Sequence, residues 1–451
     1  MKLGFSYQYL SPDNFDLSLA QVRNKILAPE AQGFRAMVVR ANDSLTVSGA
    51  TKLAEFAHAG LPIVFSGGIP QSYLGTNQES ALVKAQTSLN QTVSLSNVHV
   101  TDTYDGLAST LAAIGINPTT SISTTGSWYT AQRLDSATGV VYYYVYNDAM
   151  ESLPGQGSSK GTITFSSTGI PYELDAWTGE QMPILTYTQT SYSTSIPFTL
   201  AGNQSTIVAF LPRYQGAAIQ ANTHLTYLSD SILGSMTLDN GSIALKVGPG
   251  SGAASYSLTT GGLKFLKPIS ASSITITNWT LIVEHWDPPT DLYDIEGGAV
   301  KQNTTHALQN LVSWQQIPGL ENVSGRGYYS ASFQWPAALL ASSTSKPDGA
   351  IIDFGSVVHT LRASINGRLL PPLDVTSAKT DISQWLVQGE NKVEAVVATP
   401  LGNVLRPIWD QLQTSGTGPT DPVGGGPPPP IVNYGMLNDV VVTPYKTAVV
   451  S

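Results

Sequence analysis

The spacing of apolar residues divides the chain into two parts. Up to about residue 118, short apolar runs alternate with segments of helical spacing. The apolar runs are 35–40, 61–66 and 98–100, and the helical segments are 17–26, 48–59, 79–89 and 105–114. Strands that alternate with helices predict a parallel sheet with helices packed against it. We therefore expect residues 1–118 to form an α/β domain.

The helical period ends near residue 120, and a period of two replaces it. Alternating apolar and polar residues recur at 128–134, 140–147, 159–166 and 193–199, with turn residues between the runs. This pattern is typical of short antiparallel strands. We expect one β-sandwich over 119–300 and a second over 301–451, so the fold as a whole is mixed and mainly β.

Residues 311–400 carry the clearest strand and turn signals. Asn366-Gly367 lies between two apolar runs, which is the strongest short signal for a β-hairpin. Three motifs follow in order: S-G-x-G-x-Y-x3-F at 324–333, D-x-G-x-V at 353–357 and D-I-x3-L-x2-G-x-N at 381–391. Together they resemble the galactose-binding-like jelly roll attached to family 2 and related glycoside hydrolases. Such modules brace an enzyme or bind a sugar. A Pro/Gly-rich insertion at 414–430 precedes the final predicted strand.

The order of all segments resembles a larger protein. Two motifs precede the jelly roll: Q-R-x8-Y-Y-Y-V-Y-N at 132–147 and E-L-D-A-W-T-G-E at 173–180. A third, Y-G-x-L-x2-V-V-V-T-P-Y at 434–445, follows it. With the α/β part, they are similar to the C-terminal half of the α-L-rhamnosidases of glycoside hydrolase family 106 and their fungal relatives. The resemblance implies that residues 1–118 are flavodoxin-like. It also implies that the catalytic (β/α)8 barrel, which carries both glutamates upstream in that family, is missing from this chain.

Composition narrows the range of functions. Charged residues make up only 12% of the 451, and the net charge of −9 argues against binding a nucleic-acid backbone. No apolar run has the length of a membrane span, about 18 residues. The absence of cysteine excludes disulfides, thiol catalysis and cysteine-bound zinc. Gly67-Gly68 lacks the spacing of a phosphate-binding loop, so we expect no cofactor. No pair of histidines has zinc-ligand spacing and the acidic run lacks EF-hand spacing, so we expect no metal. The expected ligand is a carbohydrate or another small molecule. The oligomeric state stays open.

The sequence contains seven Asn-x-Ser/Thr sequons. They are Asn42, Asn90, Asn203, Asn240, Asn278, Asn303 and Asn322. Some arise by chance in a chain rich in Ser and Thr, but their number indicates an extracellular, glycosylated lineage. The first eight residues lack the apolar core of a signal peptide, so we expect no signal peptide in this chain.

Two acidic segments are candidates for carboxylate chemistry, although the catalytic residues stay unassigned. Glycoside hydrolysis needs two carboxyl groups that face each other about 5–10 Å apart. Asp175 and Glu180 flank Trp177, but the Thr-Gly turn between them favours a turn-forming role for both acids. The run 284–296 holds several acids around Pro288-Pro289, which favours a solvated connector.

The same acidic segments are the candidate ligand sites. A sugar needs a flat apolar face for stacking and polar partners for its hydroxyls. Trp286 lies beside His285, Asp287 and Asp291, and is the first candidate; Trp177 is the second. Most other aromatic residues, including those at 142–144, are expected to include core fillers.

Three functions are compatible with these observations. The first is a rhamnosidase-like protein without its catalytic barrel, serving as a carbohydrate-associated binding or scaffold protein. The second is an active glycoside hydrolase with a carboxylate site between domains. The third is a truncated hydrolase scaffold recruited to a small-molecule reaction, for example in fungal secondary metabolism.

Overall fold

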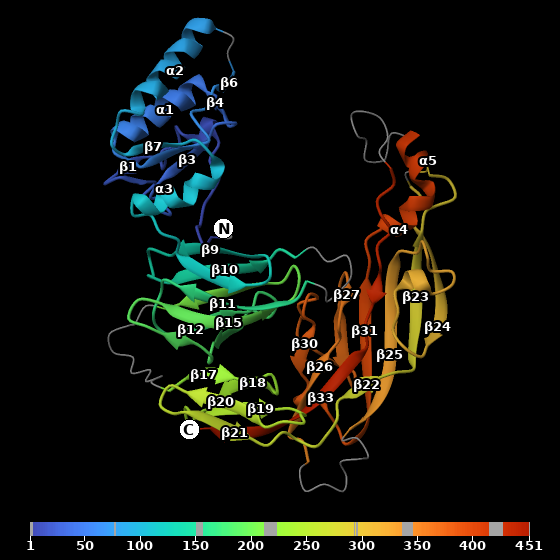
Figure 1. Ribbon diagram of the computed structural model, residues 1–451. Coiled ribbons are helices and arrows are strands. Elements are labelled where there is room, and N and C mark those ends of the chain that lie inside the picture. The colour runs from blue at the N-terminus through green and yellow to red at the C-terminus, as the bar shows by residue number, and fades with distance from the viewer. Residues whose placement is uncertain are drawn as a thin grey trace.

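The computed structural model describes residues 3–75, 78–149, 157–211, 223–292, 294, 296–335, 346–414 and 427–450. Most of the regular structure is β-strand, as the sequence predicts. Figure 1 shows an α/β unit at one end, a β-sandwich beneath it and a larger β-sandwich beside them. Within the described residues, no helix combines the length and the apolar character that crossing a membrane requires.

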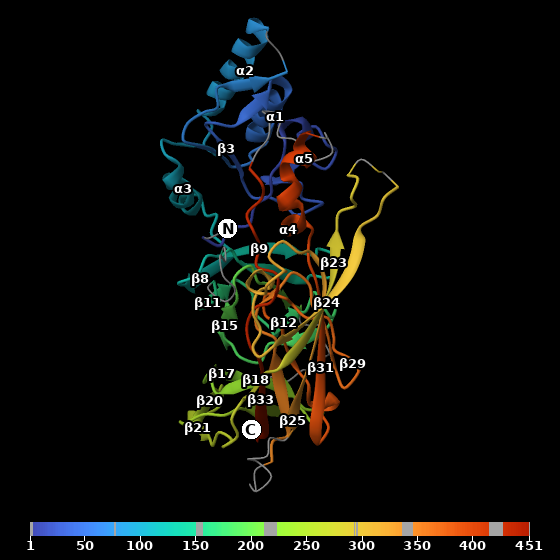
Figure 2. The same ribbon diagram turned by 90° about the vertical axis from the view of Figure 1, so that its right-hand side faces the viewer.

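A three-stranded parallel sheet in the order β3-β5-β7 forms the centre of the N-terminal unit. All four residues of β5 are buried, and Figures 1 and 2 both show α3 on the opposite side of the sheet from α1 and α2. The strands are β3 (Met37–Arg40), β5 (Ile63–Ser66) and β7 (Val98–Thr101), with the short pairs β1 (Val22–Arg23)–β2 (Ile26–Leu27) and β4 (Ser44–Thr46)–β6 (Ser72–Leu74). The helices are α1 (Val47–His58), α2 (Glu79–Thr92) and α3 (Leu107–Ala113). The parallel sheet is confirmed, whereas a flavodoxin-like fold is not.

The helix predicted over 17–26 is wrong. Its second half forms the antiparallel hairpin β1–β2, in which Arg23 pairs with Ile26. The two residues between them, Asn24 and Lys25, have φ values of 52° and 64°. A two-residue hairpin turn favours positive φ at both positions, so the local turn outweighs the helical spacing of the apolar residues.

Two antiparallel sheets form the first β-sandwich. Their strand orders are β13-β12-β16-β10-β9 and β14-β15-β11-β8. Trp128, Tyr143 and Phe165 are buried between the two sheets, as the period of two predicts. The strands are β8 (Thr120–Thr124), β9 (Trp128–Leu134), β10 (Val141–Asn147), β11 (Ser159–Phe165), β12 (Pro171–Leu174), β13 (Gln181–Pro183), β14 (Thr188–Gln189), β15 (Thr194–Leu200) and β16 (Ser205–Phe210).

A small β region and the C-terminal sandwich share the final strand, β33. This strand continues the sheet β18-β19-β33-β26-β30 and also pairs with β22. A separate sheet, β17-β20-β21, packs against β18, β19 and the end of β33. The strands are β17 (Leu225–Leu228), β18 (Ile232–Thr237), β19 (Ile243–Val247), β20 (Ala254–Leu258), β21 (Leu263–Leu266), β22 (Ile274–Ile276), β26 (Gly349–Asp353), β30 (Lys379–Asp381) and β33 (Val440–Val450).

The second sheet of the C-terminal sandwich has the order β24-β23-β25-β31-β28-β29. Its strands are β23 (Trp279–Asp287), β24 (Val300–Leu308), β25 (Gly325–Trp335), β28 (Arg362–Ile365), β29 (Arg368–Leu369) and β31 (Gly389–Ala398). The pair β27 (Val357–Val358)–β32 (Gly435–Met436) forms a separate small sheet, and the helices of this half are α4 (Gly402–Leu405) and α5 (Trp409–Thr414). Strand β23 precedes residue 300 but pairs with β24 and β25, so this sheet crosses the boundary expected there. Of the predicted insertion at 414–430, residues 415–426 lie outside the described residues.

The predicted turn at Asn366-Gly367 is confirmed. It joins β28 to β29, and both residues have positive φ, 53° and 74°. That conformation suits Asn and Gly better than any other pair, which explains why the sequence signal is reliable.

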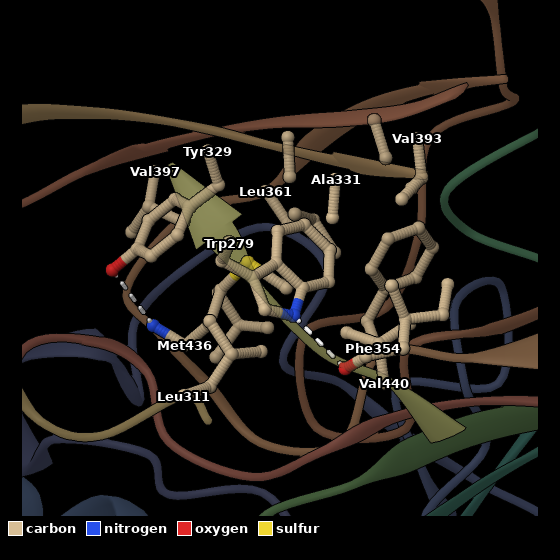
Figure 3. Packing of buried hydrophobic residues seen from close by; sticks show 14 of the residues in the cluster. Trp279, Leu311, Tyr329, Ala331, Phe354, Leu361, Val393, Val397, Met436 and Val440 are labelled. Atoms are coloured by element: carbon tan, nitrogen blue, oxygen red, sulfur yellow. Dashed lines mark hydrogen bonds between the residues drawn. The ribbon is translucent and has the colours of Figure 1, made fainter. Parts of the chain in front are cut away.

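Aromatic side chains fill the core of the C-terminal sandwich. Figure 3 shows Trp279 and Tyr329 among aliphatic residues from both sheets. Each aromatic group keeps a polar partner: Trp279 Nε1 donates to the Ile276 carbonyl at 3.0 Å, and Tyr329 Oη accepts from the amide of Met436 at 3.3 Å. Tyr329 Oη also accepts from Trp314 Nε1 at 2.7 Å. Gly435 has φ of 103°, and a Cβ there would lie 2.6 Å from Tyr329 Oη, so only glycine allows this approach.

A polar cluster joins the sheet at the middle of β33. Lys246 Nζ and Tyr445 Oη donate to Asp381 Oδ2 at 2.6 and 2.7 Å, and the amide of Ser383 donates to Asp381 Oδ1 at 2.9 Å. Burial opposes ionisation of Asp381, but these hydrogen bonds outweigh it and hold the pKa of Asp381 below its usual range. Burial raises the pKa of Tyr445 to about 12, so its phenol stays a donor.

The buried phenol of Tyr329 provides a test of the core. Tyr329→Phe leaves Trp314 Nε1 and the Met436 amide without their acceptor, and we expect a loss of about 1–3 kcal/mol in the free energy of unfolding. Denaturant unfolding followed by tryptophan fluorescence measures it. Tyr328→Phe, on the exposed face of the same strand, is the matched control and should change little. Equal stability of the two variants would contradict this assignment.

The Asp381 cluster predicts a pH-dependent contribution to stability. The folded pKa is lowered, so the contribution is present above the unfolded pKa of about 3.9 and is lost as the pH falls through the folded value. Asp381→Asn should therefore destabilise the protein at pH 7 by about 1–3 kcal/mol, with the difference from wild type shrinking below about pH 4. Asp230→Asn removes the exposed partner of Lys160 and should have almost no effect. A deficit in Asp381→Asn that is independent of pH would contradict the prediction.

Candidate functional site

The residues predicted around Trp286 lie on opposite faces of one strand. Strand β23 extends through Asp287, so residues 284–287 belong to a sheet and are not the solvated connector that the sequence favours. Side chains alternate along a strand, which buries His285 to 5% exposure and turns Trp286 outward. Figure 2 shows the β23–β24 hairpin extending beyond the rest of the sheet. The structure therefore separates His285 from Trp286.

Trp286 lies among charged side chains. Its Nε1 donates to Glu284 Oε1 at 2.6 Å, while Lys301 Nζ lies 4.5 Å and the Arg326 guanidinium 5.4 Å from the centroid of its ring. The hydrogen bond from Trp286, and then the charges of Lys301 and Arg326, keep the pKa of Glu284 below its usual range. Cations already occupy positions over the ring, so Trp286 is a poorer open platform for a sugar than the sequence predicts.

The remaining residues of this segment have local partners. His285 Nε2 and Thr304 Oγ1 lie 2.8 Å apart, and Thr304 Oγ1 lies 2.9 Å from His306 Nε2. Burial lowers the pKa of His285, which favours the neutral ring. Asp287 Oδ2 accepts from Gln302 Nε2 at 2.9 Å. Asp291 is exposed, and its carbonyl accepts from the amide of Asp294 at 3.3 Å.

The second candidate segment is a hairpin turn between β12 and β13. Asp175 Oδ1 accepts from the amides of Trp177 and Thr178 at 2.8 and 3.2 Å, and Gly179 adopts φ of 76°. Asp175 therefore stabilises the turn. Trp177 is half exposed and Glu180 is exposed. This hairpin and β23 belong to different sheets, so the two candidate segments do not form one sheet surface.

None of the carboxyl groups with a displaced pKa has the raised pKa that a general acid needs. Four carboxyl groups of the described residues have a displaced pKa, and in all four it is lowered: Asp135, Glu284, Asp381 and Glu394. A general acid that works near neutral pH needs a raised pKa. The described residues also contain no cluster of three His, Asp or Glu side chains that could hold a metal ion.

One of the sequons lies at a shallow groove. All seven sequon asparagines are exposed. Asn278 lines an open groove of about 530 Å³ that runs along β22, β23 and β25. Thr280, Ser332, Gln334 and Lys392 make much of its lining polar, so the groove differs from the apolar pocket that a small hydrophobic substrate would need.

A set of outward-facing tyrosines on β10 was not predicted from the sequence. Residues 142–144 were expected to include core fillers, but only Tyr143 is fully buried. Tyr142, Tyr144 and Tyr146 point to the outer face of β10, where Tyr144 is 45% exposed. The alternation in Tyr-Tyr-Tyr-Val-Tyr was the signal that could have identified this face.

No protein-family model and no curated protein sequence matches the chain. A solved structure of a rhamnosidase from Novosphingobium sp. PP1Y is similar, with a TM-score of 0.54 and 16% sequence identity. The match covers 97% of this chain and 36% of the rhamnosidase. A β-glucuronidase from Faecalibacterium prausnitzii matches 40% of this chain and 33% of its own at 17% identity, but its TM-score of 0.25 does not establish a common fold. The chain therefore has the fold of about a third of a rhamnosidase.

Proposed function

We propose that this chain is a non-catalytic, carbohydrate-associated binding or scaffold part of a rhamnosidase-like protein. The observation that carries the proposal is the shared fold over 97% of the chain with a protein described as a rhamnosidase. We also propose the finer assignments: glycoside hydrolase family 106 and a flavodoxin-like unit at 1–118.

The chemistry of the described residues supports binding over hydrolysis. The part of the chain that the structure describes has a three-stranded parallel sheet and no (β/α)8 barrel. Asp175 is held by the amides of its own turn, and Glu284 lies beside Lys301, so neither resembles an acid poised to protonate a leaving group. Hydroxyl and phenol groups supply much of the surface polarity instead, and they suit a neutral polyhydroxyl ligand.

The exposure of all seven sequons supports a secretory, glycosylated lineage as a further part of the proposal. Oligosaccharyl transfer needs an accessible asparagine in a surface segment. Asn240 and Asn278 lie in turns or loops between strands, in the kind of surface segment that this reaction needs.

The proposal predicts binding without hydrolysis. The purified chain should release no nitrophenol from p-nitrophenyl α-L-rhamnoside above the buffer rate, because its described carboxylates do not form an acid–base pair. Continuous absorbance at 400 nm measures release over a wide range of protein concentration.

Turnover that Asp175→Asn or Glu180→Gln abolishes would contradict the proposal, because it would reveal a catalytic carboxylate site. Asp230→Asn, at an exposed acid outside both candidate segments, is the control for an unspecific effect of charge removal.

Secretion of the chain through a eukaryotic host behind an added leader tests glycosylation. We expect a mass increase that peptide N-glycosidase F removes, and Asn278→Gln should lower it by one glycan. Intact mass spectrometry measures both. A secreted chain of unmodified mass would contradict the proposal of glycosylation.

A further inference from the structure

We propose that exposed and half-buried tyrosines at the junction of the α/β unit and the first β-sandwich form a binding surface for a neutral polysaccharide chain. We call this surface the tyrosine strip and define it by Tyr7, Tyr9, Tyr129, Tyr144 and Tyr146. The inference deepens the proposed function and rests on it, because it assigns a site and a ligand class to the carbohydrate-associated role.

The outer face of β9 and β10 supplies three of these rings. Tyr146 pairs with Tyr129 across the two strands, so both side chains lie on the same face. Tyr144 precedes Tyr146 by two residues in β10, and its ring centroid lies 6.4 Å from that of Tyr146 with an angle of 18° between the ring planes. The rings of Tyr144 and Tyr146 are therefore nearly parallel.

The N-terminal segment extends the strip towards the α/β unit. Ser6 Oγ accepts from the amide of Gln132 at 2.6 Å, which fixes the segment along β9. Figures 1 and 2 both show the N-terminus next to this strand. Tyr7 and Tyr9 meet edge to face at 5.3 Å and are 50% and 78% exposed. The pKa of Tyr7 is raised, chiefly by its hydrogen bond with Tyr9, and the phenol of Tyr129 adds to the shift.

A polar group stands at the α/β end of the strip. The Arg40 guanidinium, at the carboxyl end of β3, binds Asp43 Oδ1 through Nε and Nη2 at 2.9 and 2.7 Å. The hydrogen bond and charge of Asp43 raise the pKa of Arg40, with smaller contributions from the phenols of Tyr9 and Tyr104. Tyr104 is 52% exposed and covers Gly67, where a Cβ would lie 2.9 Å from its ring.

These features together match a carbohydrate. A sugar ring presents an apolar face for stacking and hydroxyls that donate and accept hydrogen bonds. The strip offers exposed phenol rings, and the Arg40–Asp43 pair offers both donors and acceptors without net charge. Alternate residues of a strand repeat every ~6.8 Å, so the row of rings suits a ligand that is itself a repeating polymer.

Affinity electrophoresis in native gels tests the site. The probes are three neutral polysaccharides, a rhamnan, a galactan and a xylan, each cast in a gel beside one without polysaccharide. We expect at least one of them to retard the wild-type chain. Tyr9→Ala and Tyr144→Ala should each raise the dissociation constant obtained from that retardation about tenfold or more, as truncation of a central aromatic contact does. Circular dichroism should show an unchanged fold, since both rings are exposed.

Two control variants make the result specific. Tyr192→Ala removes a ring that is 84% exposed in a distant turn and should retain wild-type retardation. Trp286→Ala tests the site that the sequence predicts and should also retain it. Binding that survives the strip variants would overturn the site but leave the proposed function intact. Failure of all three polysaccharides to retard the wild type would overturn both. Concentration-dependent self-association that only the strip variants lose would show instead that a second copy covers the strip.

Discussion

The C-terminal strand β33 is the constraint on which the arrangement of the C-terminal half depends. Its first residues pair with β22 and β26, whereas its last five pair with β19. Val440 and Val442 accordingly belong to the core of the large sandwich, and Val450 belongs to the core of the small β region. Apolar side chains of this one strand are buried in two cores, so neither core forms completely without it.

The polar cluster around Asp381 lies where β33 changes partners. Tyr445 is the last residue that pairs with β26, and Lys446 is the first that pairs with β19. Lys246 comes from β19 and Asp381 from β30, so their ion pair spans strands on both sides of β33. A fully bonded polar cluster at such a point fixes the register of the strands, because a slip of one residue would leave a charge without its partner.

Much of the fold was predictable from the sequence, and the failures have physical causes. Helix α1, the buried strand β5 and the turn at Asn366-Gly367 follow from apolar spacing and turn chemistry that local residues dictate. The false helix at 17–26 arose because apolar spacing alone does not reveal two positive φ values at Asn24 and Lys25. At the candidate site, proximity in sequence was misleading: His285 and Trp286 are neighbours in the chain but occupy opposite faces of β23. The hydrogen bond from the amide of Gln132 to Ser6 Oγ joins distant segments, and no local pattern contains that information.

The binding account depends on where a ligand meets the surface. Hydrogen–deuterium exchange of the intact chain, with and without a polysaccharide that retards it, locates that contact. Binding at the tyrosine strip predicts protection of residues 5–10 and 128–147, which carry it, and unchanged exchange at 284–302. Protection confined to 284–302 would contradict it and would return the site to the neighbourhood of Trp286.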